Sequence, residues 1–170
     1  MHLTRMFVIA VWLTTHALHA QAFSAGAPAQ ACMNQQVQSP HSVSSAGTGG
    51  YSLSAARSFY IPGKPMAIAL RGSSAFEGVL LSAFDQSSNL AGTWQAPSVA
   101  YQLACNSQSI THASANLKTV PASFTWTAPA AGTGAVAFNA TVVLSTSTSF
   151  VISGAMLSEI DDDVFLDGFE

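Results

Sequence analysis

The sequence predicts an all-β protein, an immunoglobulin-like antiparallel β-sandwich of about seven short strands. Apolar and polar residues alternate with a period of two in several stretches, which places one set of side chains on one face of a sheet. Glycine, proline, serine and asparagine separate these stretches, and helical patterns are scarce. Hydrophobic residues make up 49% of the chain and charged residues 8%, so a packed core can form. Short strands spaced in this way are typical of two-sheet sandwiches.

The first 22 residues have the pattern of a cleavable signal peptide. A basic start at Met1–Arg5 precedes the mostly apolar stretch Met6–Leu18, and Ala20–Ala22 supplies the small residues that a signal peptidase requires. The apolar stretch is shorter than the roughly 20 residues that cross a bilayer, so a membrane anchor is the weaker alternative. We therefore expect a mature chain that begins at Phe23 and has no transmembrane segment after cleavage.

The strands are predicted in chain order from the alternation. Residues 66–70 alternate after the Pro62–Gly63 turn, 79–84 are apolar on both faces, and Tyr101, Leu103 and Cys105 share one side of the next stretch. The seven predicted strands lie at 51–53, 66–70, 79–84, 100–105, 123–128, 136–144 and 149–153.

Residues 123–143 look like a β-hairpin without a single charge. Phe124 and Trp126 alternate with serine and threonine, Pro129–Gly134 supplies the reversal, and the alternation resumes at Val136. Because Trp126 is in phase with Phe124, we expect it in the core.

Charge is divided between a nearly neutral body and an acidic tail. Six of the eight acidic residues lie in Glu159–Glu170, whereas Glu77 and Asp85 are the only two between Phe23 and Ser158. So few cations argue against nucleic acid as a partner, because binding to phosphates takes many Lys and Arg contacts. We expect a sandwich domain at 23–158 and a solvated acidic tail at 159–170.

Cys32 and Cys105 are the only cysteines. Export would bring them into an oxidising compartment, where two thiols pair, and a bridge that closes so long a loop would stabilise the fold by about 4 kcal/mol. Two buried, reduced cysteines are the alternative.

No constellation of residues indicates an enzyme, a cofactor or a metal site. His41 and His112 are the only histidines after Phe23, and they could form a Ser–His–Asp set with Asp85 on paper. However, the Gly-x-Ser-x-Gly motif is missing, and two histidines lack a third credible metal ligand. We expect both histidines to make hydrogen bonds to loops.

Eight segments, in this order, resemble the reeler domain family. They are SAGAPAQAC (24–32), Pro40–His41, FYIPGKPMAIAL (59–70), FEGVLLSAFD (76–85), GTW (92–94), CNSQSITH (105–112), FTWTAP (124–129) and GTGAVAFNATVV (132–143). The resemblance implies an immunoglobulin-like sandwich, and it places Cys32 and Cys105 at positions that are cysteine in the family. It also implies an extracellular adhesion or recognition module. Phe150 stands where many members have tryptophan.

Two functions remain open at this point. The first is a secreted, non-enzymatic recognition or adhesion module that binds an extracellular glycan or protein, and Trp94, between turn residues, is the candidate ligand contact. Burial of Trp94 in the core is the favoured alternative. The second is a structural or surface-displayed protein whose ending, DDDVFLDGFE (161–170), acts as a sorting label, since it is similar to a short ending on exported proteins of some Gram-negative bacteria.

Overall fold

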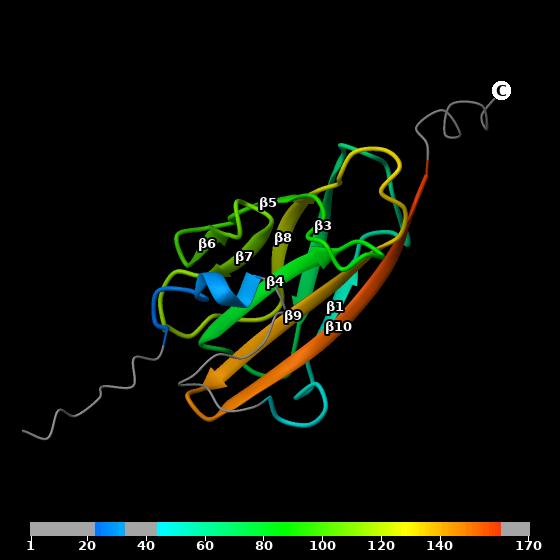
Figure 1. Cartoon of the computed structure of the whole chain (residues 1–170). Coiled ribbons are helices and arrows are strands. Elements are labelled where there is room, and N and C mark those ends of the chain that lie inside the picture. Colours follow the sequence, from blue (N-terminus) through cyan, green and yellow to red (C-terminus); the bar gives the residue numbers. More distant parts are fainter. Residues whose placement is uncertain (1–22, 33–43, 161–170) are drawn as a thin grey trace, which may run out of the picture.

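The computed structural model of the protein describes residues 23–32 and 44–160 (Figure 1). In these ranges it contains a short 3-10 helix, η1 (Ala29–Cys32), and ten strands. The strands are β1 (Ser52–Ala55), β2 (Phe59–Tyr60), β3 (Pro65–Arg71), β4 (Gly78–Phe84), β5 (Thr93–Gln95), β6 (Tyr101–Ala104), β7 (Ser109–His112), β8 (Ala122–Thr127), β9 (Val136–Ser145) and β10 (Thr148–Glu159).

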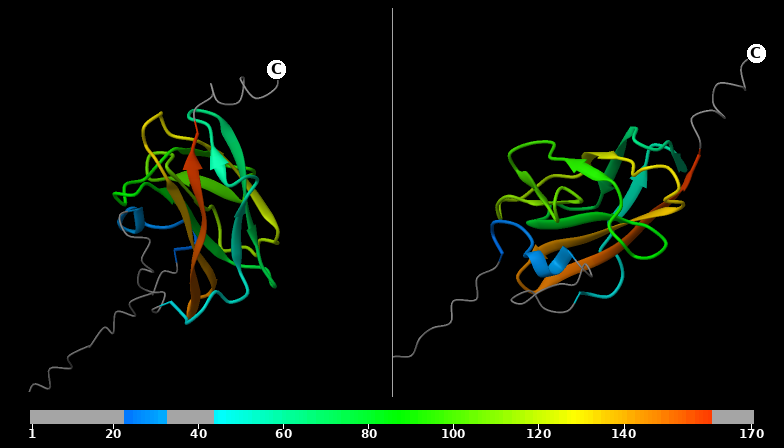
Figure 2. Two further views of the ribbon diagram at one scale, coloured as in Figure 1. Left: turned by 90° about the vertical axis from the view of Figure 1, so that its right-hand side faces the viewer. Right: turned by 45° about the horizontal axis from the view of Figure 1, so that its top comes forward.

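The strands form two sheets that face each other as two layers (Figure 2). The four-stranded sheet has the order β1-β3-β8-β5, and the six-stranded sheet has the order β2-β10-β9-β4-β7-β6. The predicted all-β sandwich is therefore confirmed. Within the two described ranges, no helix is long and apolar enough to span a bilayer.

Each of the seven predicted strands corresponds to a strand of the structure, and three further strands were not predicted. These are β2, β5 and β7, which have two, three and four residues. In β2 and β5 too few residues lie between turn residues for alternation to be recognised, and all four residues of β7 are buried, so its two faces do not alternate. One pairing also departs from the antiparallel prediction, since β2 runs parallel to β10, with Phe59 opposite Ser158.

The predicted hairpin at 123–143 is wrong, although both of its strands exist. β8 pairs with β3 and β5 in one sheet, whereas β9 pairs with β4 and β10 in the other. Alternation shows which face of a strand is buried, but it does not show which strand lies beside it. The segment Pro129–Gly134 is long enough to cross the roughly 10 Å between two packed sheets, and it connects the layers.

Trp126 lies at the centre of the core, as predicted, and is fully buried. Its ring is edge-on to Tyr60 and to Phe138, at centroid distances of 5.6 Å and 4.9 Å. The indole Nε1 donates a hydrogen bond of 3.0 Å to the carbonyl of Ala91. A side chain on the next residue, Gly92, would come within 2.5 Å of Nε1, so glycine is required beside the ring.

β10 of the six-stranded sheet contacts β1 of the four-stranded sheet. Between Ser153 and Met156, β10 has one residue more than the partner stretch of β9, which is a β-bulge. Gly154 lies in this bulge, and a Cβ on it would be only 2.5 Å from Cβ of Leu53 in β1. The absence of a side chain at Gly154 therefore allows β1 to pack against β10.

The last strand extends beyond the predicted end of the domain. We placed the boundary after Ser158, but β10 continues to Glu159, and the amide of Ile160 donates a hydrogen bond of 3.0 Å to the carbonyl of Tyr60. The predicted tail therefore begins inside the fold, and its remaining residues, 161–170, lie outside the described part of the chain.

Candidate functional site

A shallow groove of about 370 Å³ lies between the start of β6 and the start of β8. One wall is formed by Pro97, Ser98, Ala100 and Tyr101, and the other by residues 117–119 and Pro121 together with the first two residues of β8. Because β6 and β8 belong to different sheets, the groove lies where the two layers meet. Each wall of the groove therefore comes from a different sheet, and the position of one wall relative to the other depends on how the two sheets pack.

The groove has apolar side chains at its floor and on its rims. The ring of Tyr101 is half-buried and rests edge-on against Phe124 at a centroid distance of 5.1 Å, and burial raises the pKa of the phenol. Leu117 lines the groove and is 69% exposed, so its aliphatic side chain is available to a binding partner. Val99 is 98% exposed and lies in the chain between the lining residues Ser98 and Ala100.

Lys118 holds the loop on one side of the groove in place. Its ammonium donates to the carbonyls of Ser114, Asn116 and Glu77, at 2.5 Å, 2.6 Å and 2.8 Å. The backbone of Lys118 also exchanges two hydrogen bonds with Phe76. Burial lowers the pKa of Lys118, and the charge of Glu77 partly opposes this shift. The ammonium of Lys118 is therefore committed to the loop, and Ser98, Thr119 and Ser123 supply the hydroxyls of the groove.

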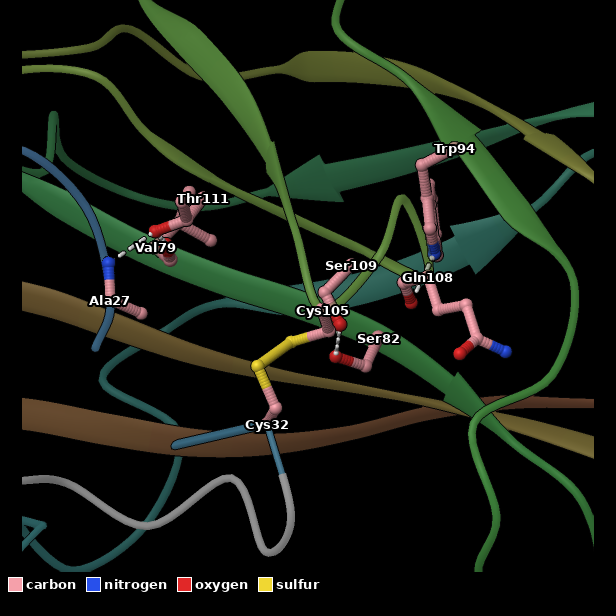
Figure 3. The surroundings of a disulfide bond; sticks show 9 residues. All are labelled: Ala27, Cys32, Val79, Ser82, Trp94, Cys105, Gln108, Ser109 and Thr111. Atoms are coloured by element: carbon pink, nitrogen blue, oxygen red, sulfur yellow. Dashed lines mark hydrogen bonds between the residues drawn. A yellow bond between two sulfur atoms is a disulfide. The ribbon is translucent and has the colours of Figure 1, made fainter. Parts of the chain in front are cut away.

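Trp94, the candidate ligand contact, is buried away from this groove. Only 3% of the residue is exposed, and its ring is edge-on to Phe138 at 5.9 Å. Its Nε1 donates a hydrogen bond of 3.1 Å to the carbonyl of Gln108 (Figure 3). This burial does not fit Trp94 as a surface aromatic. It agrees with the favoured alternative, in which Trp94 belongs to the core. Turn residues on both sides of Trp94 suggested a loop, but three residues are enough to form β5.

The predicted disulfide between Cys32 and Cys105 is present (Figure 3). The two Cα atoms are 5.6 Å apart, and both cysteines of the chain are used. The bridge connects the end of η1 to the turn between β6 and β7. It thereby attaches the N-terminal arm, residues 23–32, to the six-stranded sheet.

Three further contacts hold this arm. The amide of Ala27 donates to Oγ1 of Thr111 at 2.8 Å, and Nε2 of Gln102 donates to the carbonyl of Ala25 at 2.5 Å. His112 is 7% exposed, and its Nε2 lies 2.7 Å from the carbonyl oxygen of Phe23. The prediction that His112 bonds to a loop is therefore confirmed, whereas His41 lies outside the described residues.

The structure does not bring His112 and Asp85 together, so they do not form the Ser–His–Asp set considered from the sequence. His112 packs against Gly78 at the beginning of β4, whereas Asp85 follows the end of that strand. At about 3.3 Å per residue, the two are roughly 20 Å apart. Asp85 instead accepts hydrogen bonds from the amides of Asn89 and Ser87 in its own turn, and these lower the pKa of its carboxyl group, with Asn89 the larger cause. The described residues contain no cluster of three or more metal-ligating side chains.

The family model of the reeler domain matches residues 30–161. The chain belongs to the reeler domain family. Solved reeler domains support this assignment at the level of the fold. Two crystal structures of the human F-spondin reeler domain are 26% identical to the chain, with TM-scores of 0.56 and 0.57. Each match covers 67% of this chain, and 91% or 95% of the solved chain.

A third solved structure, the Reelin-N domain of F-spondin, matches over a longer part of this reeler domain. It is 25% identical, has a TM-score of 0.60, and covers 78% of this chain and 98% of its own. Curated protein sequences show no significant match to the chain. The comparisons thus assign the family and the sandwich fold, and the groove has to be interpreted from its own residues.

Proposed function

We propose that this reeler domain is a secreted, non-enzymatic recognition module that binds another extracellular protein through the groove between β6 and β8. The observation that carries the proposal is an exposed aliphatic side chain, Leu117, that lines the groove together with the half-buried ring of Tyr101. Such a surface buries an apolar side chain of a partner, and interface energy is concentrated in contacts of this kind.

The polarity of the groove favours a protein over a glycan as the ligand. Sugar binding relies on hydrogen bonds to many hydroxyls together with stacking on an exposed aromatic face. Here the ring of Tyr101 is half-buried against Phe124, and the protons of the Lys118 ammonium are directed to backbone carbonyls. The exposed side chain of Leu117 is aliphatic, and covering it with a protein surface gains free energy.

The family and the disulfide support the extracellular setting. The reeler domain is an extracellular type of module, and a disulfide such as Cys32–Cys105 persists in oxidising compartments. The predicted signal peptide at 1–22 supplies the route of export.

The test compares three labelled forms of the mature protein on intact cells of the source organism. We expect Leu117→Asp to weaken saturable surface binding by at least about tenfold, which corresponds to about 1.4 kcal/mol. Met156→Asp is the matched control, because Met156 is also 69% exposed but lies on β10, and it should bind like the unmodified protein. Equal binding by all three forms would rule out the groove.

A second measurement separates the two ligand classes. Protease treatment of the cells should abolish binding if the ligand is a protein. Binding that survives protease and is competed by soluble surface polysaccharide would instead identify a glycan.

A further inference from the structure

The N-terminal arm is fixed to the sandwich from its first described residue. Nε2 of His112 lies 2.7 Å from the carbonyl oxygen of Phe23, and the bonds from Gln102 to Ala25 and between Ala27 and Thr111 continue the attachment. In Figure 1 this arm is the blue segment beside the six-stranded sheet. The residue that follows the predicted cleavage site is thus already part of the fold.

The imidazole of His112 connects the N-terminal arm to the beginning of β4. On one side, Nδ1 lies 3.2 Å from the amide nitrogen and 3.3 Å from the carbonyl oxygen of Val79. On the other side, Nε2 lies 2.7 Å from the carbonyl oxygen of Phe23. The side chain of His112 therefore holds the backbone of Phe23 against β4.

A small cavity lies beside this contact. It measures about 20 Å³ and is lined by Phe23, Ser24, Glu77 and His112, together with residues of β4 and β9. A cavity of this volume accommodates one group the size of a water molecule. Glu77 is half-buried, and Lys118 interacts with its charge, although the ammonium protons of Lys118 bond to backbone carbonyls.

We propose that the peptide bond between Ala22 and Phe23 is hydrolysed during export, and that the α-ammonium group created on Phe23 binds the carboxylate of Glu77. In this step signal peptidase adds water across the bond, Ala22 leaves with a carboxylate, and the amine of Phe23 takes up a proton. The cleavage motif Ala20–Ala22 stands directly before Phe23. Phe23 and Glu77 line the same cavity, so maturation adds an ion pair to the fold.

The titratable groups at this cavity are the new ammonium, Glu77 and His112, and Lys118 acts on the charge of Glu77 from outside the lining. A free α-amino group has a pKa of about 8, and a neighbouring carboxylate raises it. The stabilisation is then fully present below the unfolded pKa and is lost as pH rises through the folded one.

The test begins with the exported protein, whose intact mass and N-terminal sequence should show that the chain starts at Phe23. Its melting temperature is then compared at pH 7 with two altered forms, one acetylated on Phe23 and one with Gly-Ser added before Phe23. We expect both forms to melt several degrees lower. This difference in melting temperature between the mature protein and its altered forms should be largely lost in Glu77→Gln and at pH 10. It should persist in the control Asp85→Asn, which removes a carboxylate at the other end of β4.

Two results would overturn the proposal. One is a mature chain that starts at another residue or retains the leader. The other is a melting temperature that does not change when the N-terminal charge is removed, or that changes by the same amount in Glu77→Gln as in the unmodified protein. The second result leaves the recognition function untouched, because the groove is tested by surface binding.

Discussion

The ammonium of Lys118 is surrounded by backbone carbonyls rather than by water. From the sequence, Lys118 is one of four cations opposing Glu77 and Asp85, and its charge suggests a place on the surface. The structure instead leaves only 5% of the residue exposed and uses all three ammonium protons to fix the loop. Nothing local in the sequence marks this role, because the carbonyls that receive the protons come from residues of any type.

Replacing Lys118 with methionine tests its role. Lys118→Met keeps most of the volume but leaves three carbonyls without their donor, which we expect to cost about 2 kcal/mol of the free energy of unfolding. Chemical denaturation measures this loss. If the loop shapes the groove, surface binding should weaken in the protein that remains folded, and Lys64→Met, a change outside the groove, should leave binding unaltered.

The hydrogen bonds of Glu159 make the stability of the fold depend on pH in the acidic range. Its carboxylate accepts hydrogen bonds of 2.6 Å from the amides of Gly134 and Gly132, and these lower its pKa. A carboxyl group with a lowered folded pKa stabilises the protein above its unfolded pKa of about 4.3 and loses this effect as pH falls through the folded value. The melting temperature should therefore fall less steeply below pH 4.5 in Glu159→Gln than in the unmodified protein. Identical slopes would contradict this role.

At the scale of the elements, the sequence predicts the faces of the strands better than their partners. Period-two alternation identified β3, β4, β8 and β9 because each buries one or both faces in the core. It could not show that β8 and β9 lie in different sheets, since pairing is decided by the tertiary packing of both layers. The groove was missed for a related reason: Leu117 is an isolated apolar residue in a loop, and it lines one groove with Tyr101 only because the fold brings this loop beside the start of β6.

The contact between β10 and β1 depends on Gly154. We expect Gly154→Ala to destabilise the domain by about 1–3 kcal/mol, because the added methyl group would lie 2.5 Å from Cβ of Leu53. Cβ is attached directly to the backbone, so relieving this contact requires the backbone of β1 or β10 to shift. Thermal or chemical denaturation gives the value. Ser153→Ala, at an exposed position of the same strand, is the control and should be nearly neutral. A tolerated Gly154→Ala would mean that β1 and β10 separate easily.

At the scale of the whole molecule, a pair of truncations locates the end of the domain. Removal of residues 161–170 should leave the melting temperature unchanged, because the described contacts of β10 end at Ile160. Removal of residues 159–170 also deletes Glu159 and the bond from Ile160 to Tyr60, so we expect a fall of several degrees. If removal of residues 161–170 is already enough to lower the melting temperature, these residues are part of the domain. If it changes only where the protein is found, the sorting-label hypothesis is supported.

The disulfide also determines how far the protein can be stretched. A chain that is pulled at its two ends lengthens as its strands detach. Cys32 and Cys105 are 73 positions apart, and at about 3.4 Å per residue the bridge withholds roughly 250 Å of contour length. In single-molecule stretching we expect the oxidised protein to extend by about this length less than the reduced one. The bridge thus keeps β1 to β6 within a closed loop while the chain outside it bears the load.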